Sequence, residues 1–357
     1  MKIVKAGYEI TPNPIGDLGL MKKIELVART CYKSEDYITD LSCIKMINNL
    51  IKRKHYAMLE HASLVFEVDS ESYYDTIRLV KDLESLNFDP NLIGYDTFKS
   101  YLRFTEHGKC IISGNIRAWI EFLNQCVKTL GKIPLFLGEY LSYKKLENNP
   151  SDIISLFGDF LDVPSEDYIF KGKRDISCTR IFDLSSLSLE ERLIHQDLTV
   201  KFIVDRAVAN ELVRHRDCSF AQESTRFCNY SKDKFGNEIT VIEPCFWIKD
   251  RSEEDNTMHD YWVGVCEDSE AMYFQLLRNG ATPQEARSVL PHSTKTEIFV
   301  TTNIREWIHI LELRALGTTG KPHPQMEEVM KPLAKELANG LLSDFTYIDS
   351  VNKMLIL

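Results

Sequence analysis

Three arginines stand close together in the segment Arg214–Phe227, which reads RHRDCSFAQESTRF. Hydroxyl and amide side chains alternate with them along the chain. Guanidinium groups bind phosphate oxygens in a two-pronged manner, and hydroxyl and amide groups complete the hydrogen bonds of a bound anion. The segment therefore predicts a site for a phosphorylated small molecule. Its candidate residues are Arg214, Arg216, Ser219, Gln222, Ser224, Thr225 and Arg226.

The same composition also fits a solvated surface loop, in which the arginines pair with Asp217 and Glu223. Such pairs are common on protein surfaces because they cost little. If Arg214–Arg216 is extended, its two arginines share one face and His215 takes the other. Composition alone leaves both interpretations open.

Other chemistries have weaker signals. Ser224 has neither a G-x-S-x-G turn nor an evident base, so we expect a binding hydroxyl and not a nucleophile. Cys218 and Cys228 are expected to be packing residues. His55 and His61 are six positions apart and not at the i, i+4 spacing of a helical metal pair, and no Cys-x-x-Cys occurs, so no metal site is predicted.

Phosphate-binding loops are also missing from the sequence. GTTGKP (317–322) has Pro322 where a Walker loop carries the Ser or Thr that holds magnesium. No G-x-G-x-x-G follows a predicted strand, which leaves a Rossmann site unsupported. Side chains must therefore hold any dinucleotide.

Hydrophobic periodicity predicts strands separated by long helices, which indicates an α+β or α/β-type domain. The N-terminal third is predicted to be mainly helical. Strands are expected at 62–68, 197–205 (followed by a helix through 213), 239–244 and 296–302. Helices are expected at 255–279, where Gly280 ends the helix, and at 281–290, 304–316 and 324–342.

Residues 69–195 are expected to be the least regular part of the chain, with a helix at 115–130 and a polar loop near 147–152. We interpret residues 1–357 as a single domain with a family-variable insertion at about 69–195. The length of 357 residues permits this organisation, although it also permits several domains.

Composition narrows the class of protein further. The net charge is −10, which argues against a nucleic-acid binder because such proteins need a basic face. No apolar run approaches the roughly 20 residues that span a bilayer, and the start MKIVKAGYEI does not resemble a signal peptide. The nine scattered cysteines are typical of a reducing compartment. We therefore expect a soluble cytoplasmic protein that binds neither membranes nor nucleic acids.

The arrangement Arg-His-Arg, seven residues, then Ser is diagnostic of one enzyme family. It occurs here as RHRDCSFAQES (214–224), and this chain resembles the flavin-dependent thymidylate synthases. The resemblance covers roughly residues 1–68, 196–244 and 271–340, in order. Its other motifs are AGYEI, ARTCYKSED, HYAMLEHASLVFEV (55–68), DRAVANELV, STRFCNYSKDKFG, ARSVLPHSTKTE (286–297), TTNIREWIHILELRA (301–315) and PHPQM (322–326). SGNIRAWIEF (113–122) resembles a stretch of some longer members.

The resemblance implies a thymidylate synthase-complementing-protein-like fold, with a central, mostly antiparallel sheet flanked by long helices. It implies that dUMP is methylated to dTMP with 5,10-methylenetetrahydrofolate as carbon donor. Tightly bound FAD would supply the hydride after reduction by NADPH. It also implies a homotetramer whose active sites are shared between subunits.

Site residues follow from the resemblance position by position. Arg314 would lie against the uracil edge as the catalytic cation, and Ser224 and Arg226 would serve a site completed by another subunit. The dUMP-binding residues would be Glu211, Arg214, Gln222, Ser224, Arg226 and Arg287. The FAD-binding residues would be His55, Ala57, Glu60, His215, Arg216, Asn303, Arg305 and His309.

Five positions depart from the common motif. Ala221, Gln222 and Phe227 occupy places where many members have Asn, Glu and Tyr, Glu211 replaces a Gln, and Ala57 replaces a Thr. These departures motivate one alternative, a flavin- or nucleotide-binding homologue without turnover. A second alternative, an RNA- or DNA-binding module, is disfavoured by the acidic total and by the lack of an aromatic-basic stripe.

Overall fold

The computed structural model describes residues 1–12, 14–86, 102–138, 178–226, 228–232, 236–248 and 250–357. They form two compact units. The first unit contains Met1–Pro12, Ala28–Glu35 and Leu198–Leu357, and the second contains Asn13–Val27 and Asp36–Asp197. The interpretation as one domain with an insertion stays a prediction. Within the described ranges, no helix has both the length and the apolarity to cross a membrane.

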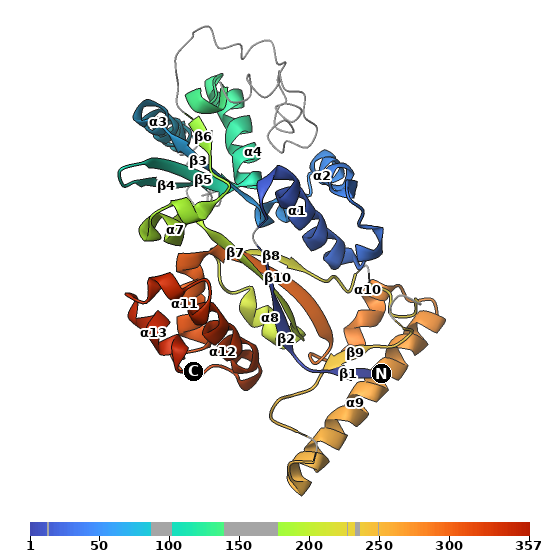
Figure 1. Cartoon of the computed structure of the whole chain (residues 1–357). Coiled ribbons are helices and arrows are strands. Elements are labelled where there is room, and N and C mark those ends of the chain that lie inside the picture. The colour runs from blue at the N-terminus through green and yellow to red at the C-terminus, as the bar shows by residue number, and fades with distance from the viewer. Residues whose placement is uncertain (13, 87–101, 139–177, 227, 233–235, 249) are drawn as a thin grey trace. The chain divides into compact units, whose positions relative to one another are not determined.

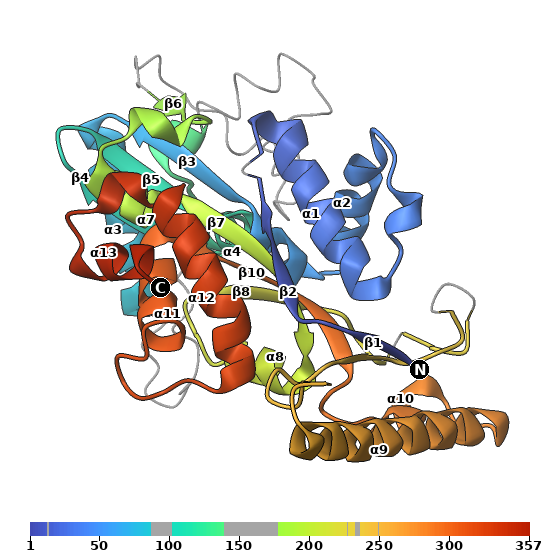
Figure 2. The same cartoon turned by 60° about the horizontal axis from the view of Figure 1, so that its bottom comes forward.

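The first unit is built on a four-stranded sheet with the strand order β2-β7-β10-β8 (Figures 1 and 2). β2 pairs antiparallel with β7, and β8 pairs antiparallel with β10. Side chains of β10 are buried at seven consecutive positions, which is typical of a central strand covered on both faces. The bounds are β2 (Gly7–Thr11), β7 (Asp197–Asp205), β8 (Ser219–Gln222) and β10 (Lys295–Asn303). A parallel pair, β1 (Lys2–Val4) and β9 (Thr240–Ile242), forms a separate two-stranded sheet, and a bridge between Val241 and Thr294 joins β9 to the residue before β10.

Two helices of this unit begin directly where a strand ends. The Asp205 side chain accepts a hydrogen bond from the Val208 N–H and caps α8 (Arg206–Leu212). Asn303 caps α11 (Ile304–Arg314) in the same way. Such caps satisfy backbone N–H groups that the first helical turn leaves unpaired. The sharp strand-to-helix junctions fix which residues lie at the ends of β7 and β10.

The remaining helices cover this framework. α11 packs with α12 (Pro324–Asn339) and α13 (Asp349–Leu355), and α12 also contacts β2. The long helix α9 (Glu253–Arg278) contacts the short helix α10 (Pro283–Ala286). The chain turns after α9 at Gly280, whose φ of 92° favours glycine.

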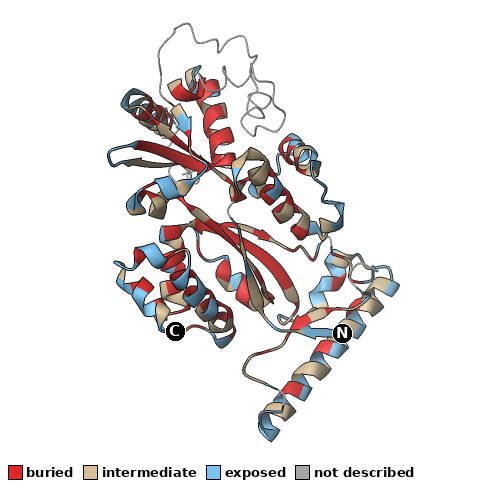
Figure 3. Ribbon diagram, in the orientation of Figure 1, coloured by how far each residue is buried: buried red, intermediate tan, exposed pale blue. Residues whose placement is uncertain are grey.

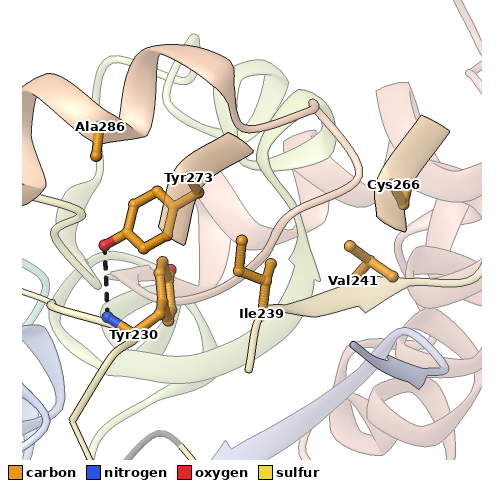
Figure 4. Close-up of a cluster of buried hydrophobic side chains, with 6 residues drawn as sticks. All are labelled: Tyr230, Ile239, Val241, Cys266, Tyr273 and Ala286. Carbon is orange, nitrogen blue, oxygen red and sulfur yellow. Dashed lines mark hydrogen bonds between the residues drawn. The ribbon is translucent and has the colours of Figure 1, made fainter. Parts of the chain in front are cut away.

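A separate apolar cluster lies beside α9. Figure 4 shows Tyr230 and Tyr273 facing one another, with ring centroids 5.6 Å apart. The Tyr230 backbone N–H donates to the Tyr273 hydroxyl. Only part of α9 is buried, and Figure 3 shows exposed residues along the rest of the helix. The cluster comprises Tyr230, Ile239, Val241, Cys266, Tyr273 and Ala286.

The second unit has its own four-stranded antiparallel sheet with the order β4-β5-β3-β6. Phe66 of β3 packs against Trp119 and Phe136 in its core. The strands are β3 (Ser63–Val68), β4 (Leu102–Glu106), β5 (Cys110–Asn115) and β6 (Cys178–Arg180). The helices are α2 (Ser42–Lys52), α3 (Ser70–Leu86), α4 (Ile116–Gln125) and α7 (Leu189–His195), and α1 (Gly16–Tyr32) crosses the boundary between the units.

The predicted class is confirmed, since the described chain is a mixed helix-and-sheet protein with antiparallel sheets. Its strands are divided among three sheets and do not form a single central one. The expectation that 69–195 is the least regular part was wrong for the described residues, which include β4, β5 and α3. The helix at 281–290 is shorter than expected, because only Pro283–Ala286 is α-helical. The loop near 147–152 lies outside the described residues.

Candidate functional site

The segment predicted to bind an anion is not a solvated loop along its whole length. Ser219–Gln222 forms β8, in which Ser219 faces Thr301 and Gln222 faces Ile298 of β10. The Glu223 N–H continues this pairing by donating to the Glu297 carbonyl at 2.8 Å. The segment is therefore a strand held by the central sheet, which the sequence pattern did not predict.

The Arg-His-Arg turn precedes β8 and alternates in burial. Arg214 and Arg216 are exposed, whereas His215 is 7% exposed. The backbone here is a turn and not extended, so the condition of that prediction is not met, although the two arginines are exposed and His215 is buried. Thr302 Oγ1 ties the turn to β10 by donating to the Asp217 carbonyl at 2.7 Å.

Arg314, the last residue of α11, reaches this turn. Its Nε–H donates to His215 Nε2 at 3.2 Å, and Nη1 donates to Glu211 Oε2 at 3.1 Å. Nη2 lies 3.5 Å from the Glu211 carbonyl oxygen. We call Glu211, His215 and Arg314 the Arg314 group. Three residues that the sequence placed in one site are therefore in direct contact.

The electrostatics of this group define the state of His215. Burial, together with the charge of Arg314 and of His309, lowers the pKa of His215 to about 4. The imidazole is therefore neutral near pH 7. Because an arginine Nε–H can only donate, Nε2 must accept and Nδ1 carries the proton. His215 thus acts as a fixed acceptor for Arg314.

Arg314 retains capacity to bind a ligand. A guanidinium group has five N–H donors in a rigid plane. The contacts to His215 and to Glu211 use three of them. Two donors remain, and both lie in a plane whose orientation is fixed by neighbours. This is the property required of a cation that must point at one edge of a planar substrate.

The predicted FAD residues of α11 lie at its start and along one exposed face. Asn303 is the N-cap, and its side chain accepts from the Glu306 N–H at 2.8 Å. Arg305 and His309 are exposed and four positions apart, so they share one side of the helix. An exposed guanidinium and an imidazole beside a polar amide are a donor set suited to a diphosphate.

A second group lies beyond the other end of β8. Arg287 Nη1 donates to Thr225 Oγ1 at 3.3 Å, and the Arg226 N–H donates to Ser224 Oγ at 3.4 Å. We call Ser224, Thr225, Arg226 and Arg287 the Arg287 group. The four residues of β8 lie between the Arg287 group and the Arg-His-Arg turn. A strand of four residues spans roughly 10 Å from its first to its last residue. The predicted residues of unit one therefore fall into two clusters.

Gln222 adjoins the Arg287 group at the end of β8. Its Nε2 donates to Thr296 Oγ1 at 3.2 Å. Ala221, one residue earlier, is 2% exposed and faces Phe299. These two departures from the common motif thus occupy positions where the strand packs against β10. Phe227 lies outside the described residues.

The remaining predicted FAD residues belong to the second unit. His55 and Ala57 are exposed, and His55 immediately precedes the 3-10 helix Tyr56–His61. Glu60 accepts a hydrogen bond from Arg117 Nη1 at 2.6 Å, and Arg117 Nε donates to Glu121 at 2.7 Å. Sequence reasoning gave Glu60 no partner, because Arg117 is far from it along the chain.

A buried ion cluster beside the Arg287 group was also missed. Glu223 is 3% exposed and lies 3.4 Å from Lys295 Nζ and 3.8 Å from Lys33 Nζ. Both lysines also contact Glu297, as does Lys201 at 2.9 Å. We call Lys33, Lys201, Glu223, Lys295 and Glu297 the lysine–glutamate cluster. The alternative in which Glu223 pairs with surface arginines was therefore wrong.

The fold and these groups define an α+β protein whose arginines gather at both ends of one strand of a central sheet. Comparison with known families extends this description. Residues 179–340 match the thymidylate synthase complementing protein family. The resemblance to the flavin-dependent thymidylate synthases is confirmed for this region, which contains the Arg314 and Arg287 groups.

Individual relatives agree with the family match. The chain is 30% identical over 109 residues to a flavin-dependent thymidylate synthase of Pyrococcus furiosus, covering 30% of this chain and 42% of the relative. It is 30% identical over 152 residues to that of Corynebacterium aurimucosum, covering 40% and 59%. The chain thus spans about half the length of these curated relatives. The UMP/dUMP methylase PolB of Streptomyces cacaoi, solved with 5-Br dUMP, is 14% identical over 95% of this chain and 93% of that chain, with a TM-score of 0.38.

Proposed function

We propose that this chain is a flavin-dependent thymidylate synthase that converts dUMP to dTMP. The carbon would come from 5,10-methylenetetrahydrofolate and the hydride from FAD reduced by NADPH, all in the cytoplasm. The observation that carries this proposal is the Arg314 group, in which a guanidinium with two remaining donors is held by His215 and Glu211. These residues lie within the region that matches the family.

Arg314 is assigned to the uracil ring. A cation fixed beside the edge of the ring stabilises negative charge at N3 and on the adjacent oxygen. That charge delocalises towards the ring carbon that must attack the methylene donor. Because His215 and Glu211 already hold the guanidinium, little reorganisation is needed when the charge develops.

The Arg287 group is assigned to the phosphate of dUMP. Arg226 and Arg287 provide positive charge, and Ser224 provides a hydroxyl donor. Gln222 would also contact the nucleotide, although its amide already donates a hydrogen bond to Thr296. Arg214, exposed on the preceding turn, and Glu211 would complete the nucleotide contacts.

The flavin residues are assigned by their donor chemistry. When bound, FAD supplies the hydride that reduces the transferred methylene group. Arg216, Arg305 and His309 would bind its diphosphate and Asn303 would donate through its amide, since the Asn303 oxygen already caps α11. In the second unit His55, Ala57 and Glu60 would contact the flavin and folate.

The two groups support a shared site. Arg314 and Arg226 lie beyond opposite ends of β8, whereas one dUMP must meet a cation at its base and another at its phosphate. We infer that the Arg314 group of one subunit and the Arg287 group of another serve the same nucleotide. This arrangement needs a homo-oligomer, and we propose a homotetramer.

A non-catalytic nucleotide- or flavin-binding homologue is the second candidate. It is favoured by the buried Ala221 and by the Gln222 amide, which bonds within the sheet. Both positions differ from the common motif.

Anaerobic turnover separates the two candidates. The purified protein should be yellow, release FAD on denaturation, and form dTMP from dUMP, methylenetetrahydrofolate and NADPH. Bound flavin without dTMP would favour the non-catalytic homologue. A protein that takes up no flavin even after reconstitution would contradict both candidates.

A further inference from the structure

Glu223 stands between Gln222 and Ser224, two residues assigned to the nucleotide, yet its own side chain points into the protein. Its carboxylate is 2% exposed and contacts Lys33 and Lys295. Lys295 and Glu297 are two positions apart on β10 and therefore share a face of the sheet, whereas Thr296, which binds Gln222, lies on the other. At this end of the strands, the face of the sheet with Gln222 and Thr296 carries neutral side chains. The opposite face carries the lysine–glutamate cluster.

The backbone beside Glu223 is fixed at several points. The Glu223 N–H donates to the Glu297 carbonyl at 2.8 Å, and Arg206 Nη2 donates to the Glu223 carbonyl at 3.2 Å. The Ser224 N–H donates to the Cys31 carbonyl at 3.2 Å. The Cys228 N–H closes the turn by donating to the Ser224 carbonyl at 3.0 Å. The turn that carries Ser224 and Arg226 is therefore anchored before any ligand binds.

Lys33 connects the end of α1 to the cluster. It follows α1 with a φ of 47°, in the left-handed region that normally favours glycine at this position. Here the side chain contacts both Glu223 and Glu297. These two contacts join the residue that follows α1 to the strand end that carries Glu223.

We propose that Glu223, held by Lys33 and Lys295, is a positioning residue that fixes the phosphate-binding turn of the dUMP site. This inference rests on the proposed function. Arg226 and Arg287 are exposed and would lose conformational freedom on binding a phosphate. A turn that is fixed in advance reduces that loss and so increases affinity. Glu223 itself, being buried, touches neither substrate nor cofactor.

Calorimetry with dUMP on the flavin-loaded protein tests the proposal. Glu223→Gln removes the charge that Lys33 and Lys295 share, and we expect the Kd for dUMP to rise about tenfold. Lys201→Gln is the matched control, because Lys201 contacts Glu297 and Glu9 but not Glu223. It should leave the Kd within about twofold of the wild-type value, the scatter expected for a residue outside the contact.

Two further readouts separate positioning from general stability. Deoxyuridine has no phosphate, so the difference between wild type and Glu223→Gln should disappear with this ligand. In the conversion assay Glu223→Gln should raise KM for dUMP while kcat and flavin content stay close to wild type. If Glu223→Gln does not fold, Lys33→Gln replaces it, with the same expected loss of dUMP affinity.

Some results would overturn the proposal. One is unchanged dUMP affinity in Glu223→Gln, and another is equal weakening in Glu223→Gln and Lys201→Gln. A loss that is as large for deoxyuridine as for dUMP would also overturn it. If the wild type binds no dUMP, the proposed function itself fails and this inference with it, an outcome distinct from the other three.

Discussion

Arg314 is a half-buried arginine that is held in place and yet keeps donors for a ligand. It is held by an acceptor on each side, His215 and Glu211, and it still has donors to spare. An arginine on an exposed helix end would otherwise sample many rotamers. Because the guanidinium is already fixed, it loses no further conformational entropy when substrate binds. A donor that is oriented in advance can stabilise a charge that develops during the reaction.

Replacing Arg314 therefore separates chemistry from cofactor binding. We expect Arg314→Ala to lower kcat/KM for dUMP by at least about 100-fold, because the fixed donor to the uracil edge is lost. Arg314→Lys should recover little, since an ammonium cannot reproduce the planar fork. Flavin absorbance should stay near wild type in both, with Arg278→Ala as a surface control. Near-normal turnover in Arg314→Ala would refute the assigned role.

His215 predicts a specific dependence of stability on pH. Its pKa is lowered to about 4, so the folded protein resists protonation while the unfolded chain takes up a proton near pH 6.5. The free energy of unfolding should therefore fall as pH decreases from about 6.5 to about 4. In His215→Gln, which keeps an acceptor but cannot titrate, this part of the slope should be absent.

Urea denaturation of both proteins at several pH values measures the difference. His195, whose buried imidazole has a pKa lowered to about 3, contributes equally to both and cancels. Parallel stability curves for wild type and His215→Gln would show that His215 is not the titrating group.

Residue-level prediction succeeded where the pattern itself carried the information. The bounds of β7 followed from its run of branched and aromatic residues. The partners of Glu60 and Glu223 were not, because Arg117 and Lys33 come close to them only after folding. Charge pairing between distant segments leaves no periodic signal in a sequence.

Among the elements, the junction of β10 and α11 positions the residues that we assign to the flavin. Asn303 ends the strand and caps the helix, so a single residue sets where Arg305 and Arg314 lie. The two arginines are nine positions apart, or about two and a half helical turns. One rigid element therefore carries contacts assigned to the flavin and to the uracil.

Asn303 is predicted to have separable structural and binding roles. Asn303→Ala should lower the free energy of unfolding by about 1 kcal/mol, because the Glu306 N–H loses its acceptor. Asn303→Asp keeps that acceptor and should be close to wild type in urea denaturation. If the amide donates to FAD, flavin content should nevertheless fall in Asn303→Asp. Equal stability of the Ala variant and wild type would contradict the capping role.

Long elements were predicted well and short ones poorly. β7 matches its predicted bounds of 197–205, and α9 and α11 lie within a few residues of theirs. β8 was missed because four residues with two polar side chains show no clear alternation. Its strand conformation is imposed by pairing with β10. β1 and β2 were missed for a related reason, since β1 pairs with β9, far along the chain.

At the scale of the whole molecule, most of the predicted site lies in one unit. The first unit holds every residue of the Arg314 and Arg287 groups, whereas His55, Ala57 and Glu60 lie in the second. The boundary passes through α1 between Val27 and Ala28. This division could not be predicted from composition, because the segments of each unit are discontinuous in sequence.

Complementation between two inactive variants tests whether the active site is shared between subunits. Arg314→Ala and Arg226→Ala each remove one half of every site and should be inactive alone. In oligomers reassembled from equal amounts of both, random pairing restores one intact site in each mixed pair, or about a quarter of wild-type activity. We predict this recovery of dTMP formation. Mixed oligomers that stay as inactive as the single variants would contradict it and would confine the site to one chain.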